Sequence, residues 1–285
     1  MRFTKMQAYG NPYIYIDAIH QNITNENELA RFVSDKHFGV GSDGMVMICP
    51  SEKCDFRMRI FNPDGSEAEM CGNALRSTSK YVYDYGLTSK EDITIETIGG
   101  VQRVHLFVED KKAVNICADI GEPRFSKQQI PVQTQLDEFV DQPVAVLDKT
   151  MNLSSLSWGN PHTVSFIDDV DSFDVEGYGK AIECNLELFP QKTNVTFAQV
   201  VNRDYIKIRE WERNCGETIG CGTGCCTAAV FAMRLGMCNR KVTVHQIGGD
   251  LTVEWDEKTN HVFMTGPSHI IFESEIDTDD MQYMV

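Results

Sequence analysis

The chain has 285 residues and a formal net charge of −16, which disfavours nucleic acid and anionic membrane surfaces as partners. Its length allows two lobes of about 100–150 residues, each with its own core. The first residues contain no apolar signal segment, no run approaches the ~18 apolar residues of a membrane span, and ten cysteines fit a reducing compartment, so we expect a cytoplasmic protein.

The first half of the chain has the pattern of a mixed α/β lobe. Apolar and charged residues alternate over 55–61, which predicts a half-buried strand, and the Asn-Pro-Asp-Gly segment at 62–65 predicts the turn that ends it. A helix is predicted over 73–85, and Gly86 ends it. Further strands are predicted at 92–97, 101–109 and 114–120.

The second half repeats this order after a polar, glutamine-rich connector at 122–143. Its helix, predicted over 223–235 and ended by Gly236, has almost no polar face, which is typical of a helix surrounded by its own sheet. We therefore expect an N-terminal lobe at 1–125 and a C-terminal lobe at 126–285. The remaining predictions for this half are a strand at 205–211, a turn at 214–216, and strands at 241–246, 251–255 and 261–265.

Three landmarks recur in both halves at nearly equal spacing. A Gly-Asn-Pro segment at 10–12 returns at 159–161, and the two asparagines, Asn11 and Asn160, lie 60 and 61 positions before Cys71 and Cys221. An Ile-Gly-Gly segment follows each cysteine. A long period that occurs only twice predicts a duplicated half rather than a solenoid. The expected fold is α/β (α+β), with two pseudo-symmetric lobes, each a sheet wrapped around a central helix, and an active site in the cleft between them.

Cys71 and Cys221 each precede a glycine at the start of a predicted helix. Unpaired backbone N–H groups and the partial positive charge there lower the pKa of a thiol and bind anions. A thiolate on one side and a thiol on the other is what a two-base racemase needs, because one removes a proton from a carbon and the other returns a proton to the opposite face. Fixed donors around the carboxylate would stabilise the carbanion, so no cofactor is needed.

The paired cysteines are also compatible with three simpler roles. They could form a structural disulfide, although the reducing compartment disfavours it. They could bind zinc, although the chain lacks a second pair of ligands at metal-binding spacing, and we expect no metal. They could also be inert core residues, which would leave the neighbouring Gly-Asn and Gly-Thr-Gly segments unexplained.

Five motifs spread over the chain carry a family resemblance: residues 61–66, 69–73, 159–162, 193–197 and 211–224. Together they resemble diaminopimelate epimerase, an isomerase that works without pyridoxal phosphate in the bacterial lysine and cell-wall pathway. The resemblance implies two similar lobes and the interconversion of LL- and meso-diaminopimelate. It also implies an acid–base pair of Cys71 and Cys221, with His162 assisting the first thiol and Glu212 the second. The implied substrate-binding residues are Asn11, Asn62, Gly72, Asn73, Asn160, Asn194, Arg213, Gly222 and Thr223.

Departures from the family pattern bear on the substrate more than on the chemistry. They fall at Pro12, Gly44, Ala74 and Ser77, which support the Cys71 side of the expected cleft. A racemase of another amino acid, such as histidine, is therefore one alternative. A non-catalytic amino-acid-binding protein, in which the helix starts hold a carboxylate, is another. We expect a small-molecule substrate, and the oligomeric state, a homodimer included, stays open.

Overall fold

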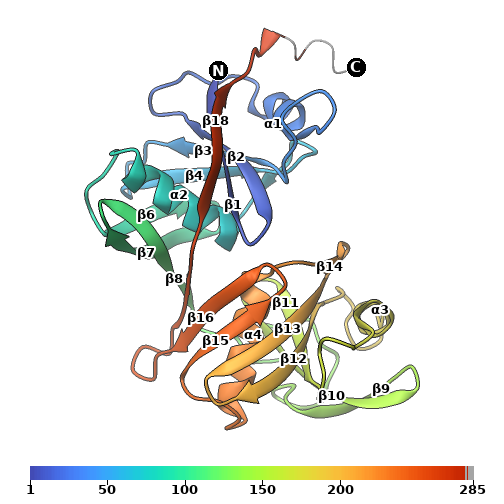
Figure 1. Ribbon diagram of the computed structural model, residues 1–285. Coiled ribbons are helices and arrows are strands. Elements are labelled where there is room, and N and C mark those ends of the chain that lie inside the picture. The colour runs from blue at the N-terminus through green and yellow to red at the C-terminus, as the bar shows by residue number, and fades with distance from the viewer. Residues whose placement is uncertain (280, 282–285) are drawn as a thin grey trace. The chain divides into compact units, whose positions relative to one another are not determined.

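The computed structural model describes residues 1–279 and 281, and its backbone divides into two compact units (Figure 1). The first unit comprises Met1–Asp119 and the described residues from Thr265 on, and the second comprises Ile120–Met264. The lobe boundary expected from the sequence puts residues 269–275 in the C-terminal lobe, and no strand is predicted there. In the structure, β18 (His269–Glu275) pairs antiparallel with β1 (Arg2–Ala8) and so belongs to the first unit. Pairing between segments so far apart in the chain cannot be predicted from the local alternation of apolar and polar residues.

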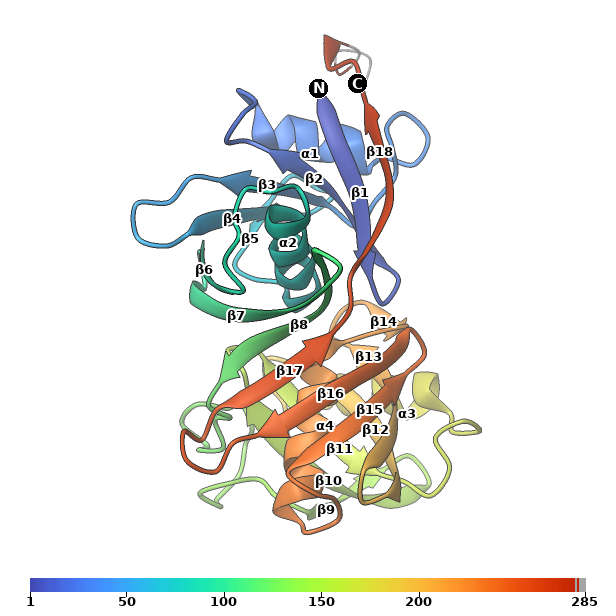
Figure 2. The ribbon, with the colours of Figure 1, turned by 60° about the vertical axis from the view of Figure 1, so that its left-hand side comes forward.

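In the first unit the strands pair in an order that curves around the helix α2, Gly72–Asp84 (Figure 2). The neighbours β2–β3 and β4–β6 are parallel, and the other pairs are antiparallel. The remaining elements are β2 (Asn11–Asp17), α1 (Glu26–Ser34), β3 (Met45–Cys49), β4 (Phe56–Phe61), β5 (Glu67–Ala68), β6 (Asp92–Thr97), β7 (Gly100–Glu109) and β8 (Lys112–Gly121).

The second unit repeats this pairing scheme element by element. Its parallel pairs, β11–β12 and β13–β15, stand where β2–β3 and β4–β6 stand in the first unit. The chain duplication expected from the sequence is therefore present in the topology. The elements are β9 (Gln142–Val146), β10 (Lys149–Ser157), β11 (Pro161–Phe166), α3 (Val175–Glu183), β12 (Asn194–Asn202), β13 (Tyr205–Glu212), β14 (Gly216–Thr218), α4 (Gly222–Arg234), β15 (Lys241–Gln246), β16 (Gly249–Trp255) and β17 (Val262–Gly266).

The central helices α2 and α4 have matching ends. Each follows a cysteine in an extended conformation, and each ends before a glycine with φ 73°, Gly86 or Gly236, as predicted. Both pack against the strands of their own unit, α2 on β1 to β4 and β7, and α4 on β11 to β13, β15 and β16. Within the described residues no helix is both long and apolar enough to cross a membrane.

A second helix in each unit covers the outer side of the same strands. Leu29 and Phe32 of α1 pack with Ile14 and Met45, whereas Val175 and Ile182 of α3 pack in the core of the second unit. Strands enclosed by helices on both sides, such as β2 and β12, are buried along most of their length. Strands with one solvent-facing side, such as β6 and β15, alternate between buried and less buried residues.

Residues 122–143 are more than a connector. Ile130, Val132 and Phe139 are buried in the core of the second unit beside Leu153 and Phe189. The segment is rich in glutamine, so its composition does not indicate that these three apolar residues are buried. The segment is therefore part of the second unit, and the chain passes between the units within β8 and again within β17.

Removal of residues 267–285 tests the assignment of β18. Without this strand the outer edge of β1 loses its partner, so amide hydrogen exchange of residues 2–7 should accelerate, whereas amides of β12 should keep their protection. Exchange followed by mass spectrometry measures both. Loss of protection in β12 with an unchanged β1 would contradict the assignment.

Candidate functional site

Cys71 is the N-cap residue of α2, where its backbone is extended (φ −142°, ψ 120°) and its carbonyl accepts from Leu75 N at 2.9 Å. Its thiol is partly exposed and donates to Asn11 Oδ1 at 3.8 Å. Asn11 is placed there by the tight turn at Tyr9 and Gly10, both of which have positive φ, between β1 and β2. The predicted pair Asn11 and Cys71 therefore meets in the first unit.

Asn73 joins the same cluster, which we name the Cys71 site (Asn11, Tyr13, Cys71 and Asn73). Its amide donates to Asn11 Oδ1 at 3.2 Å, and it accepts from the buried guanidinium of Arg76. Asn11 in turn donates to Asp43 Oδ2 at 2.7 Å. The two amides are thus held by charged groups on each side, which fixes their orientation toward the thiol.

Tyr13 belongs to this site although the sequence did not mark it. The nearby Cys71 charge and burial raise the pKa of Tyr13, so its hydroxyl stays protonated and hydrogen-bonds with Cys71. The repeat contains a signal that could have found it. Tyr13 and His162 follow the two Gly-Asn-Pro segments at the same offset.

Asn62 lies in the turn after β4, and Gly72 lies at the start of α2. Asn62 follows β4, where its amide donates to Ser66 Oγ at 3.0 Å and its carbonyl accepts from Gly65 N at 2.9 Å. Gly72 is the first residue of the helix and is partly exposed. Asn62 therefore shapes the predicted turn, and its described hydrogen bonds are to that turn.

Cys221 caps α4 in the same backbone conformation (φ −126°, ψ 109°) but is buried, with 8 % of its surface exposed. Its Sγ accepts from Gly224 N at 3.4 Å and lies 3.5 Å from Thr223 Oγ1. Its own backbone N–H donates to Gln246 Oε1 at 2.9 Å. We name Cys221, His162, Glu210 and Glu212 the Cys221 site.

The pKa of the Cys221 thiol contradicts the expectation that a helix start lowers it. Burial, followed by the charges of Glu210 and Glu212, raises this pKa well above its usual value, and the donors at Gly224 and Thr223 offset only part of the rise. Desolvation therefore outweighs the helix N-terminus here. Cys221 is therefore a neutral thiol at neutral pH.

Glu212 and Arg213 stand at the end of β13, where adjacent side chains can reach one ligand. Glu212 Oε1 accepts from Thr218 Oγ1 at 2.7 Å, and burial raises the pKa of Glu212. The Arg213 backbone N–H donates to Asn194 Oδ1 at 2.9 Å, and the Asn194 amide donates to Pro161 O at 2.9 Å. The structure thus brings Asn194 and Arg213 together.

His162 lies on β11 with no exposed surface, and neither ring nitrogen has a hydrogen-bond partner among the described residues. Its Nδ1 is 3.8 Å from Glu210 Oε1. Burial and then the charge of Arg213 lower the pKa of His162 to about 3, so the ring is neutral at neutral pH. By contrast Asn160, in the β10–β11 turn, is exposed, and Gly222 and Thr223 at the start of α4 are partly exposed.

Glu210 is the second residue that the sequence did not mark. Burial raises the pKa of Glu210 to about 8, despite hydrogen bonds with Thr196 and Cys221. The alternation of β13 could have revealed it, because Glu210 and Glu212 are two positions apart and so share one side of the strand.

The four departures from the family pattern surround the Cys71 site. Pro12 O accepts from Asp43 N at 2.8 Å, Ala74 is fully buried, and Ser77 Oγ lies 2.7 Å from Ser268 Oγ. Gly44 has φ 150° and lies against the Tyr13 ring. Pro12 and Gly44 therefore contact the residues around Cys71, whereas Ala74 and Ser77 are buried positions of α2.

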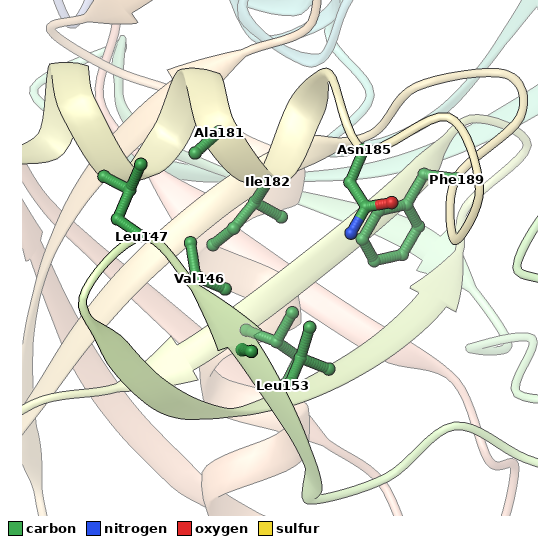
Figure 3. A pocket seen from close by; sticks show the side chains of 9 residues that line it. Val146, Leu147, Leu153, Ala181, Ile182, Asn185 and Phe189 are labelled. Atoms are coloured by element: carbon green, nitrogen blue, oxygen red, sulfur yellow. The ribbon is translucent and has the colours of Figure 1, made fainter.

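A small cavity of about 80 Å³ lies elsewhere in the second unit, between the β9–β10 hairpin and α3 (Figure 3). Its lining is mostly aliphatic, with Val146, Leu153 and Ile182 pointing inward and Asn185 at one end. It includes none of the residues of the Cys221 site. We therefore assign the cavity no role in the chemistry of the Cys221 site.

Comparison with known proteins agrees with these observations. The family model of diaminopimelate epimerase matches residues 3–126 and 154–271. A diaminopimelate epimerase of Methanococcus maripaludis is 48 % identical over 277 residues, covering 97 % of this chain and all of the relative. One of Acetivibrio thermocellus is 47 % identical over 281 residues, covering 99 % of this chain and all of the relative.

Solved structures with low identity share the fold. A phenazine biosynthesis protein of the PhzF family from Bacillus anthracis superposes with a TM-score of 0.72 at 19 % identity, covering 97 % of this chain and 99 % of that one. A hydroxyproline epimerase from Agrobacterium vitis gives a TM-score of 0.64 at 12 % identity, covering 97 % and 90 %. These matches bear out the two-lobed α/β fold.

Substitution of Gly44 tests the close approach beside Tyr13. A Cβ there would lie 2.3 Å from Phe61 O and 2.8 Å from the Tyr13 ring, so Gly44→Ala should lower the free energy of unfolding by about 2–3 kcal/mol in urea titrations. Gly86→Ala is the matched control, because Gly86 has φ 73° but no described atom within 4 Å of the new Cβ. Gly86→Ala should lower the free energy of unfolding by about 1 kcal/mol. Equal losses would show that the close approach has no energetic effect of its own.

Proposed function

The chain belongs to the diaminopimelate epimerase family, and we propose that it interconverts LL- and meso-diaminopimelate as an isomerase that needs no cofactor. The observation that carries this proposal is the pair of cysteines at equivalent helix starts, Cys71 before α2 and Cys221 before α4. The same topological position in each unit presents a thiol beside the free N–H groups of a helix.

In the proposed mechanism one cysteine, as the thiolate, removes the proton from the α-carbon and becomes a thiol. The other cysteine, as the thiol, gives its proton to the opposite face and becomes the thiolate. Cys221 fits the donor role in the resting protein because burial keeps its thiol protonated. That both thiols reach one substrate in a common cleft stays a prediction.

Charge that develops on the substrate needs fixed donors. We assign this role to the backbone N–H groups at the two helix starts, at Gly72 and Asn73 and at Gly222 and Thr223, which have no acceptor within their own helix. The remaining polar residues would hold the other amino and carboxylate groups. These residues are Asn11, Asn62, Asn160, Asn194 and Arg213.

Two further assignments follow the family pattern. We propose that Glu212, whose own pKa is raised by burial, takes the proton from Cys221 when that cysteine acts as the base, and that His162 assists Cys71. The mechanism requires reduced thiols, and all ten cysteines in the described part of the chain are free. We therefore also propose a reducing, cytoplasmic compartment. A homodimer stays a prediction.

Replacement of each cysteine tests the proposal. Cys71→Ala and Cys221→Ala should each lower the rate of LL- to meso-diaminopimelate conversion by at least about 10³-fold, because each removes one of the two proton carriers. Circular dichroism melting should show that both variants fold. Chiral chromatography measures the conversion.

The matched control is Cys184→Ala, which removes an exposed thiol at the end of α3 and should keep normal turnover. Near-normal turnover of Cys71→Ala would refute the two-base mechanism. Activity of the unaltered protein on histidine or another amino acid, but not on diaminopimelate, would show that the substrate is a different amino acid. Binding of amino acids without turnover would indicate a binding protein.

A further inference from the structure

Glu210 is a buried acid that the proposed mechanism does not use. It lies two residues before the end of β13 with 2 % of its side chain exposed, and its strand neighbours are Thr196 on β12 and Thr218 on β14. Acidic side chains are rarely buried to this extent unless they are paired. A specific partner must therefore compensate for the cost of its burial.

The two carboxyl oxygens of Glu210 have different surroundings. Oε2 accepts a hydrogen bond from Thr196 Oγ1, whereas Oε1 has no hydrogen-bond partner among the described residues. The His162 ring approaches this oxygen, with Nδ1 at 3.8 Å from Oε1, and Nδ1 also lacks a hydrogen-bond partner within the described chain. Two buried polar atoms that face each other without a hydrogen bond are costly.

A single proton satisfies both atoms. If Oε1 carries a proton it can donate to the lone pair of Nδ1, and a shift of about 1 Å brings the two atoms to hydrogen-bond distance. A neutral imidazole that accepts at Nδ1 carries its own proton on Nε2. The carboxyl group would therefore determine which nitrogen of His162 is the donor.

The same carboxyl group lies next to the Cys221 thiol. A Cβ added to Gly224 would lie 2.4 Å from Glu210 Oε2 and 2.8 Å from Oε1, and the Gly224 N–H donates to Cys221 Sγ. Glu210 therefore occupies the space that a side chain at 224 would need. This contact accounts for the glycine three positions after Cys221.

We propose that Glu210 is a positioning residue of the Cys221 site, which donates its carboxyl proton to His162 Nδ1 and so fixes the ring with its proton on Nε2. The importance of this contact for turnover rests on the proposed function. The proton distribution at neutral pH agrees with it, since burial raises the pKa of Glu210 to about 8 and lowers that of His162 to about 3. Both groups are then neutral.

The contact implies a fall in activity at alkaline pH. Glu210 is protonated below about pH 8, and above it the carboxylate loses the donor to His162 and adds a negative charge beside Cys221. The other titratable or charged groups that act on this pair are Glu212 on the same strand, Cys221 at the start of α4, and Arg213 after β13.

Three variants test the proposal. Glu210→Gln keeps an N–H donor for Nδ1 and an oxygen for Thr196 but does not ionise, so its kcat/KM should fall less at neutral pH than that of Glu210→Leu and should persist above pH 8. Glu210→Leu removes the donor and should lower kcat/KM by about 10–100-fold. Glu254→Gln, at an exposed ion pair with Lys241, is the matched control and should behave like the unaltered protein.

A second measurement does not depend on epimerase activity. The ¹⁵N shifts of the His162 ring, assigned with His162→Gln, should show the Nε2–H tautomer in the unaltered protein and in Glu210→Gln, but a mixture in Glu210→Leu. An unchanged tautomer in Glu210→Leu, or an alkaline limb shared by Glu210→Gln and the unaltered protein, would overturn the proposal. Absence of turnover in the unaltered protein would instead refute the proposed function. The tautomer of His162 would then still show whether Glu210 donates to its Nδ1.

Discussion

The start of a helix enclosed by its own sheet is the constraint on which both sites depend. The first N–H groups of α2 and α4 have no partner within the helix, so polar groups must gather where the strands end. The two units place the same elements there. Gly99 N donates to Glu69 O at 3.1 Å and Gly248 N to Ile219 O at 2.6 Å, and each acceptor lies two residues before a cysteine. The repeated turns thus fix the chain that leads into each thiol.

The two cysteines have the same position in the topology but different chemical surroundings. The partly exposed Cys71 is surrounded by neutral donors and acceptors from Tyr13, Asn11 and Asn73, whereas the buried Cys221 faces Glu210 and Glu212. A two-base reaction needs one thiolate and one thiol at the same time. The duplication supplies two equivalent backbone positions, and the side chains around the two thiols differ between the units. Burial and two acidic neighbours raise the pKa of Cys221.

Local patterns predicted the elements that form the sites and missed those held by distant contacts. Alternation identified β4 and β13, and the glycines with positive φ ended α2 and α4 as expected. The pairing of β18 with β1 and the burial of Phe139 depend on segments far apart in the chain. The pKa direction of Cys221 was wrong because its burial is a property of the tertiary structure, which no motif reveals.

Proton exchange at one carbon is the central claim, and isotope transfer tests it most directly. The reduced protein, without added cofactor, is incubated with LL-diaminopimelate in D2O, and the meso product and its α-deuterium are followed together by NMR and mass spectrometry. A proton carrier that exchanges with solvent should deliver deuterium to the inverted α-carbon, so we expect meso product with one deuterium there. Meso product that keeps its original hydrogen, or no product at all, would contradict the account.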